Sequence, residues 1–172
     1  MIINGKADEE VWTNCQKLSS SYNDHGQMTA QVNIGDDGIY LFLSATHKEV
    51  NTHQYWCYNP NFEIRIGESL QNYDVIRVVR YNANTTLYTA NIGEAMMNST
   101  YDNVLKLYQT DCEIFISYEK IHNYDANNDI AIGISFRADE AEFDPWNAFY
   151  INGSSTWDLN KLYIGKEGWV IR

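Results

Sequence analysis

Residues 55–66 of the chain read Tyr55-Trp56-Cys57-Tyr58-Asn59-Pro60-Asn61-Phe62-Glu63-Ile64-Arg65-Ile66. An aromatic loop with a proline turn leads directly into a segment in which apolar and charged residues alternate. Because successive side chains of a β-strand point to opposite faces, Phe62, Ile64 and Ile66 are expected on one apolar face. Glu63 and Arg65 then lie on the opposite, charged face. The stretch therefore predicts a half-buried strand preceded by a loop that carries aromatic rings.

A second decisive stretch lies upstream, where residues 31–34 alternate between polar and apolar side chains. The turn sequence Gly35-Asp36-Asp37-Gly38 follows, and the strongly apolar run 39–43 comes after it. Alternating strands on either side of an Asp-Gly pair are the strongest short-range signal for a β-hairpin.

The rest of the chain repeats this pattern of short strands and turns. We expect hairpins joining residues 74–81 to 86–90 and 103–108 to 112–120, strands over 130–137, 149–151, 161–164 and 169–171, and an irregular connection over 93–101. About eight to ten short strands without a long helix predict an all-β fold, an antiparallel β-sandwich of jelly-roll or immunoglobulin-like type. No repeat or linker divides the chain, so residues 1–172 are expected to form a single domain.

Composition limits the classes of partner. The chain has 23 acidic and 12 basic residues, a formal net charge of −11, so its field repels phosphate backbones and anionic lipids. Nucleic acid is therefore excluded as an expected partner, whereas a neutral ligand meets no penalty and a divalent cation is attracted. Cys15, Cys57 and Cys112 form no disulfide framework.

The chain lacks the sequence signals of membrane insertion and of a leader. No run of about 18 apolar residues predicts a membrane span, and no basic and then apolar leader precedes Ile2. We interpret the chain as a module, a monomer or a part of a larger multidomain chain, whose targeting signal lay upstream.

At the N-terminus, the chain opens with Ile3-Asn4-Gly5-Lys6-Ala7-Asp8-Glu9-Glu10-Val11-Trp12. The Asn4-Gly5 pair predicts a turn, and Asp8 is a candidate N-cap for one short helical turn. Trp12 is expected to be buried at the end of the core.

Five segments together resemble the family 9 carbohydrate-binding modules and their DOMON-like relatives. They are the opening 3–12, which is similar to the family's I-D-G-x-x-D-E-x-x-W, the hairpin 32–43, the strands 61–66 and 132–136, and the closing segment 157–162. The chain departs from the family pattern at Asn59 and Asn61, where an aspartate is usual, at Asp158-Leu159, which lacks a proline, and at Tyr163, where a small residue is common.

The resemblance implies a β-sandwich that binds a mono-, oligo- or polysaccharide without catalysis. Such domains are accessory modules of secreted enzymes that degrade polysaccharides, which implies an extracellular or cell-envelope location. Some members hold a sugar between two tryptophans, and Trp56 and Trp157 occupy the corresponding places. Trp146 is a reserve candidate. If either indole is instead part of the core, no such clamp exists.

Strand parity adds polar candidates from the residues themselves. With Ile76 and Val78 facing the core, Arg77 faces outward, and Arg137 faces outward from its own strand for the same reason. Glu63, Arg77 and Arg137 are therefore expected on one face, where they supply an acceptor and fork-shaped donors for sugar hydroxyls. Glu63 and Arg77 also fall where the family places polar ligand contacts. The alternative is a solvated face with a cross-strand Glu–Arg pair.

Metal binding is a weaker prediction. Asp125, Asn127 and Asp129 place oxygen ligands at alternate positions, as at the start of a calcium loop, and some family members carry structural calcium. The later Gly and Glu of an EF-hand are missing, so an Asn/Asp-rich turn is the alternative. His47, Glu49 and His53 match no familiar zinc spacing.

No catalytic motif accompanies these residues. A nucleophile with a recognisable base is absent from the sequence, as are G-x-S-x-G and a phosphate-binding glycine loop. The alternatives to a binding module are a structural spacer domain of a larger extracellular protein and an enzyme built on the same sandwich.

Overall fold

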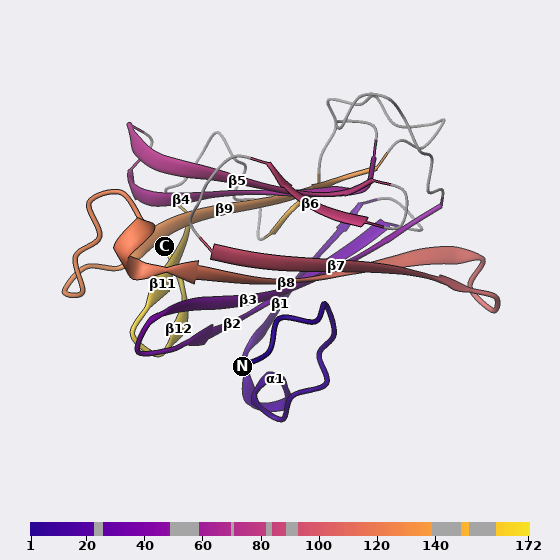
Figure 1. Cartoon of the computed structure of the whole chain (residues 1–172), viewed down its shortest axis with the longest axis horizontal. Helices are drawn as coiled ribbons and strands as arrows, with labels where there is room; N and C mark the ends of the chain where they lie inside the picture. The colour runs from indigo at the N-terminus through magenta and orange to yellow at the C-terminus, as the bar shows by residue number, and fades with distance from the viewer. Residues whose placement is uncertain are drawn as a thin grey trace.

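The computed structural model describes residues 1–22, 26–48, 59–69, 71–81, 84–88, 93–138, 149–151 and 161–172. Within these residues, two antiparallel β-sheets pack face to face as a sandwich (Figure 1). The expected all-β sandwich is confirmed. Among the described residues, no helix has the length and apolar character needed to cross a membrane.

The first sheet has the strand order β1-β2-β3-β8-β7. Its strands are β1 (Lys17–Tyr22), β2 (Gly26–Ile34), β3 (Gly38–His47), β8 (Leu107–Ser117) and β7 (Gly93–Asp102). The expected hairpin joins β2 to β3, and the Gly35 N–H donates to the Gly38 carbonyl at 2.9 Å. Gly38 is required by close approach, because a Cβ there would lie 2.2 Å from the Ile116 carbonyl oxygen of β8.

The second sheet has the order β12-β11-β9-β4-β5-β6, and the short strand β10 also pairs with β9. Its strands are β12 (Gly168–Ile171), β11 (Leu162–Gly165), β9 (Ile130–Arg137), β4 (Asn61–Ser69), β5 (Asn72–Tyr81), β6 (Asn84–Tyr88) and β10 (Phe149–Tyr150). The stretch that begins with Asn61 is therefore an inner strand, hydrogen-bonded to β5 on one side and β9 on the other.

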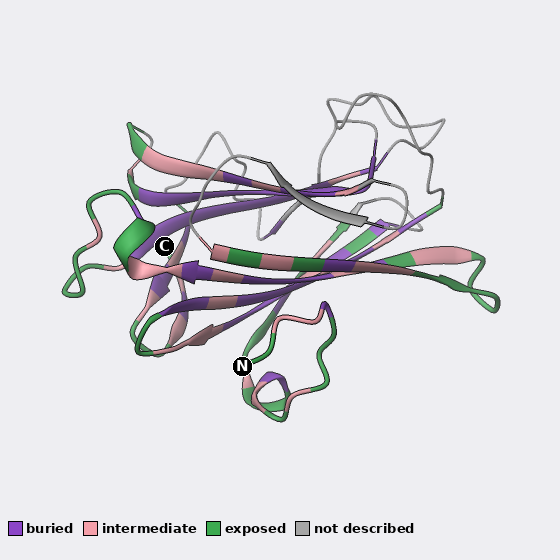
Figure 2. Cartoon of the chain, viewed as in Figure 1, coloured by how far each residue is buried: buried purple, intermediate pink, exposed green. Residues whose placement is uncertain are grey.

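The core lies between the two sheets. Phe62, Ile64 and Ile66 of β4 are fully buried there, as the alternation predicts. Phe62 meets Phe136 of β9 with ring centroids 4.8 Å apart. Figure 2 shows that β4 and β9 are buried along most of their length. Because consecutive residues of each strand are buried, both faces of the sheet are covered there.

Two predictions for this region are wrong. The expected hairpin joining 103–108 to 112–120 does not form, because Leu107–Ser117 is the single continuous strand β8 and pairs with the strand before it. Residues 93–101 were expected to be irregular, yet Gly93–Asp102 forms the ten-residue strand β7. The turn falls instead at residues 103–106, where Lys106 has φ 59° and its N–H donates to the Asp102 carbonyl at 2.8 Å. As the last strand of its sheet, β7 buries only Met97, so it lacks the alternation that identifies a half-buried strand.

The N-terminal segment packs on the outer face of the first sheet (Figure 1). It contains the single-turn helix α1 (Val11–Asn14), whereas the 3₁₀ turn η2 (Tyr118–Lys120) follows β8. Trp12 is buried as expected, but it packs against Phe42 outside the main core, with ring centroids 5.8 Å apart. Asp8 is not the N-cap, because α1 begins after Glu10 and Asp8 accepts from the Asn4 side chain instead.

Glu113 of β8 anchors this segment. Its side chain accepts backbone N–H groups of Asn4 at 2.7 Å and Gly5 at 2.8 Å, and the indole N–H of Trp12 at 3.0 Å. Gly5 adopts φ 75°, a conformation that favours glycine and lets consecutive N–H groups converge on one carboxylate. The expected Asn4-Gly5 turn is thus an anchor between the start of the chain and its eighth strand.

Candidate functional site

The register of β4 brings three predicted residues to one face. Glu63 lies opposite Arg77 of β5 and opposite Ser135 of β9, and Asn61 lies opposite Arg137. This face points away from the core, because the residues of β4 between these positions are the core residues. The parity prediction for Glu63, Arg77 and Arg137 is confirmed. We call the outward-facing residues Asn61, Glu63, Arg65, Arg77, Ser135 and Arg137 the β4 face.

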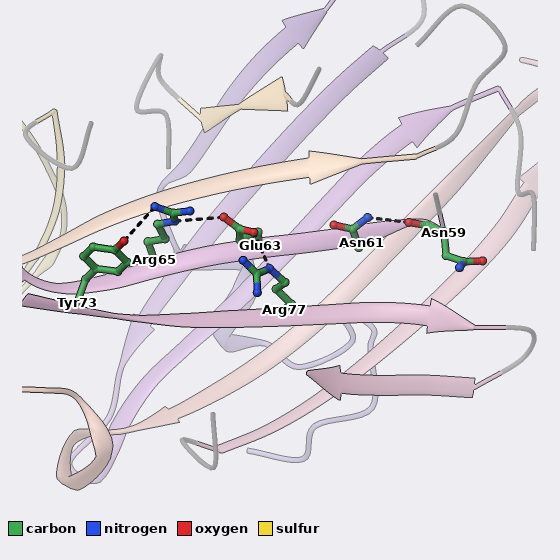
Figure 3. Close-up of polar contacts among 6 residues, drawn as sticks. All are labelled: Asn59, Asn61, Glu63, Arg65, Tyr73 and Arg77. Carbon is green, nitrogen blue, oxygen red and sulfur yellow. Dashed lines mark hydrogen bonds and ion pairs between the residues drawn. The ribbon is translucent and has the colours of Figure 1, made fainter. Parts of the chain in front are cut away.

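Glu63 is held by two arginines (Figure 3). Arg77 Nε donates to Glu63 Oε2 at 2.7 Å, and Arg65 Nε donates to Glu63 Oε1 at 3.1 Å. Arg65 also donates from Nη1 to the Tyr73 hydroxyl at 3.2 Å, and its guanidinium lies 5.2 Å from the centroid of that ring. Both carboxylate oxygens of Glu63 therefore already have a charged donor.

The β4 face is largely buried, which contradicts the alternative of a solvated face. Glu63 is 3% exposed and Arg65 is 8% exposed, and Ser135 is fully buried. Charged groups can be buried when each is paired and hydrogen-bonded. The cross-strand pair of Glu63 with Arg77 and the in-strand pair with Arg65 meet that condition. The cross-strand Glu–Arg pair of the alternative is therefore present, but it is buried and not exposed to solvent.

The electrostatics keep Glu63 ionised. Burial alone raises the pKa of a carboxyl group, but the hydrogen bond from Arg77 and the charges of Arg77, Arg65 and Arg137 lower it by more. The net effect holds the pKa of Glu63 below its ordinary value. A carboxylate in this state is an acceptor only, so it can receive further hydroxyl donors at its remaining lone pairs.

Three neighbouring polar atoms on the β4 face have no hydrogen-bond partner. They are Asn61 Oδ1, Ser135 Oγ and Arg137 Nε, all of them buried. The Asn61 amide nitrogen is satisfied, since it donates to the Asn59 carbonyl at 2.7 Å. A buried polar group without a partner costs about 1–3 kcal/mol, and such groups are rare in folded proteins. The three lie in adjacent register positions of β4 and β9, and within the described residues they make no hydrogen bond.

Sequence reasoning left Asn61, Arg65 and Ser135 out of the site. The signal that could have found them is the same alternation that found Glu63 and Arg137, because 61, 63 and 65 share a face, as do 135 and 137. Trp56 and Trp157, predicted as the aromatic clamp, lie outside the described residues. So do the reserve candidate Trp146 and the weak metal candidates Glu49 and His53.

The predicted calcium ligands form a separate loop between η2 and β9. Asp125 Oδ1 accepts the Asn127 backbone N–H at 2.9 Å and the Asn127 side-chain amide at 3.0 Å, and Asp129 is paired with Arg172. These contacts build the Asn/Asp-rich turn that was the alternative, and a guanidinium beside Asp129 disfavours a second cation there. Across the described ranges, no group of three His, Cys, Asp or Glu residues could hold a metal ion. Calcium binding stays a prediction that this arrangement does not favour.

A surface pocket of about 340 Å³ lies beside this loop. It is lined by Gly67, Glu68, residues 121–125 and residues 128–130. It contains no residue of the β4 face. His47, the remaining weak metal candidate, is buried and hydrogen-bonded to Thr110 at 2.7 Å.

Comparison with known proteins supports the fold. No protein-family model and no curated protein sequence matches the chain. A family 9 carbohydrate-binding module from Caldicellulosiruptor kristjanssonii, solved in complex with cellotriose, is similar with a TM-score of 0.62 and 14% identity over 99% of this chain and 88% of that chain. A family 9 module from the same organism in complex with glucose gives a TM-score of 0.60 and 13% identity, over 91% of this chain and 85% of that chain. The chain thus has a fold similar to family 9 modules, as the sequence resemblance implied.

Proposed function

We propose that this chain is a non-catalytic carbohydrate-binding module whose ligand lies on the β4 face. The observation that carries the proposal is the set of buried atoms without partners, Asn61 Oδ1, Ser135 Oγ and Arg137 Nε, beside the ionised Glu63. The solved structures of similar fold hold cellotriose and glucose, and this agrees with a sugar as the missing partner.

The chemistry of the face suits sugar hydroxyls. Each hydroxyl both donates and accepts, so a sugar needs acceptors and donors side by side. Glu63 and the Asn61 carbonyl oxygen are acceptors, the arginines are donors, and the Ser135 hydroxyl is either. All of these groups project from the rigid inner strands β4, β5 and β9, so their geometry is fixed before a ligand arrives.

Trp56 and Trp157 are proposed to supply the apolar part of the binding energy. The C–H faces of a pyranose pack flat against indole rings, and burying about 80 Å² on each ring contributes about 2 kcal/mol per face. After association costs, this supports micromolar to millimolar affinity. In this proposal the chain is an accessory module of a secreted protein that acts on polysaccharides.

Titration of the intrinsic tryptophan fluorescence with glucose, cellobiose, xylobiose and soluble glucans tests the proposal. Each titration is repeated with the variant Ser135→Ala and with the control Glu94→Gln, which alters an exposed residue on the first sheet. A sugar that binds the wild type and the control, but binds Ser135→Ala at least threefold more weakly, supports the β4 face. If no saccharide binds, the result favours the alternative function, a structural spacer domain without a sugar site. Release of products from a polysaccharide would instead identify an enzyme.

A further inference from the structure

We infer that the β4 face selects a sugar unit that carries a carboxylate, a uronic acid, over the neutral sugar of the same stereochemistry. The inference rests on the proposed function and names the ligand class of the same site. It starts from the ion pairs on this face, in which Arg65 and Arg77 are paired with Glu63 and Arg137 is not.

The arginines of the β4 face outnumber its carboxylates. Across positions 61–65 of β4, 75–79 of β5 and 133–137 of β9, the outward-facing residues include Arg65, Arg77 and Arg137 but a single acid, Glu63. The two oxygens of Glu63 accept from Arg77 and Arg65 and not from Arg137. Arg137 lies on the same face, beside Asn61, but no ion pair joins it to Glu63 in the described structure.

Arg137 is the unmatched group. Its Nε is buried and makes no hydrogen bond, and its side chain is half-buried at the end of β9. Guanidinium groups in such places bind carboxylates with two parallel hydrogen bonds, because the fork of N–H donors matches the two oxygens. A neutral hydroxyl could accept one of these N–H groups but would leave the charge uncompensated.

The neighbours of Arg137 fit the remainder of one sugar unit. Asn61, with its unpaired carbonyl oxygen, lies directly opposite Arg137. Ser135 lies two residues along the strand, about 7 Å away, a distance that a pyranose ring and its C5 substituent can span. A uronate carboxylate on Arg137 therefore leaves the ring hydroxyls at Asn61, Ser135 and Glu63, where acceptors are present.

The net charge of −11 opposes the approach of an anionic ligand, and Asp139 and Glu140, which follow Arg137 in the sequence, lie outside the described residues. At physiological ionic strength the Debye length is about 8 Å, so charges spread over the rest of the surface are largely screened. A carboxylate in contact with Arg137 lies well inside that length. Direct contact with the guanidinium therefore acts on the ligand more strongly than acidic residues beyond that length, which mainly slow its approach.

Isothermal titration calorimetry with matched sugars tests the inference. The pairs are glucuronic acid with glucose and galacturonic acid with galactose, and galactose 6-sulfate is included as an anion without a carboxylate. At least one uronic acid is expected to bind about tenfold more tightly than its neutral partner, which corresponds to about 1.4 kcal/mol. Arg137→Gln should reduce this preference to within threefold, whereas Arg172→Gln, which removes an exposed arginine paired with Asp129, should preserve it.

Other outcomes would contradict either the inference or the proposed function, and the two cases can be told apart. Equal or tighter binding of every neutral sugar would overturn it and leave the proposed function intact. Persistence of the preference in Arg137→Gln would also overturn it, as would tighter binding of the sulfated sugar than of both uronic acids. Failure of every sugar, neutral or acidic, to bind would remove the proposed function itself.

Discussion

The Glu113 carboxylate accepts the indole N–H of Trp12 at 3.0 Å, across 101 positions of sequence. The same carboxylate receives the N–H groups of Asn4 and Gly5, so one buried side chain on β8 binds both the Asn4-Gly5 turn and Trp12. Replacing it leaves several buried donors without an acceptor, each costing about 1–3 kcal/mol. Glu113→Ala is therefore expected to lower the free energy of unfolding by about 3 kcal/mol in urea titrations.

The matched control for this change is Glu94→Ala, at an exposed position on the neighbouring strand β7. Its effect should stay within about 0.5 kcal/mol. Equal losses for the two variants would show that the Glu113 cradle does not stabilise the fold.

Ser135→Ala should separate stability from binding. The Ser135 hydroxyl is buried without a partner, so its removal relieves an unsatisfied polar group and should leave the free energy of unfolding unchanged or raise it by up to about 1 kcal/mol. Sugar affinity should fall at least threefold in the same protein. A clear loss of stability would show that the hydroxyl is satisfied within the fold and argue against its role in binding.

Acid should destabilise the protein through Glu63. Its pKa in the folded state is held below the ordinary value of 4.5, so its contribution to stability is present above that value and is lost as the pH falls through the lowered folded-state value. Glu63→Gln should therefore flatten the fall of the melting temperature below about pH 4.5. It should also lower the melting temperature at pH 7, because it breaks a buried ion pair.

Glu113 should have the opposite dependence on pH. Burial raises its pKa above the ordinary value of 4.5, and hydrogen bonds from Asn4, Gly5 and Trp12 only partly oppose this. A carboxyl with a raised folded-state pKa binds its proton more tightly in the native state, so its contribution declines as the pH rises from 4.5 through the raised value. Comparing the melting temperature of the wild type with that of Glu113→Gln between pH 4 and 7 tests the sign, and the difference should shift in favour of the variant as pH rises.

Gly38→Ala should destabilise the β2–β3 hairpin. The new methyl group would meet the Ile116 carbonyl oxygen at 2.2 Å, and backbone atoms can yield only by displacing β8. The expected loss is about 1–3 kcal/mol. Gly35→Ala, whose methyl group would meet the movable Tyr40 and Asp37 side chains, is the control and should lose less.

Local signals predicted most of the sandwich, and pairings distant in sequence account for the errors. The hairpin around Gly38 was predictable because the turn and both strands lie within a short stretch. Strand β7 was missed because an edge strand buries too little to show alternation. The burial of Glu63 was not predictable from its own strand, because its partner Arg77 lies 14 positions away and becomes a neighbour only in the folded sheet.

The placement of the candidate site residues was predictable from the sequence, but their hydrogen bonding was not. Parity placed Glu63, Arg77 and Arg137 on one face, since it needs only the direction of successive side chains. It could not show that Asn61 and Ser135 lack partners, because satisfaction of a polar atom depends on every group around it. Trp12 shows the same limit. Its burial was predictable because its side chain is large and apolar, but the sequence did not show that it packs against Phe42 on the outer face of the first sheet.

The position of the N-terminal segment has a practical consequence for measurement. This segment is bonded to the outer surface of the first sheet, whereas the β4 face is the outer surface of the second. A protein tethered to a sensor chip or resin through its N-terminus would therefore hold the outer side of the second sheet away from the support, where attachment would not obstruct a polymeric ligand. The sandwich thus offers a built-in handle on the side opposite to its candidate site (Figure 1).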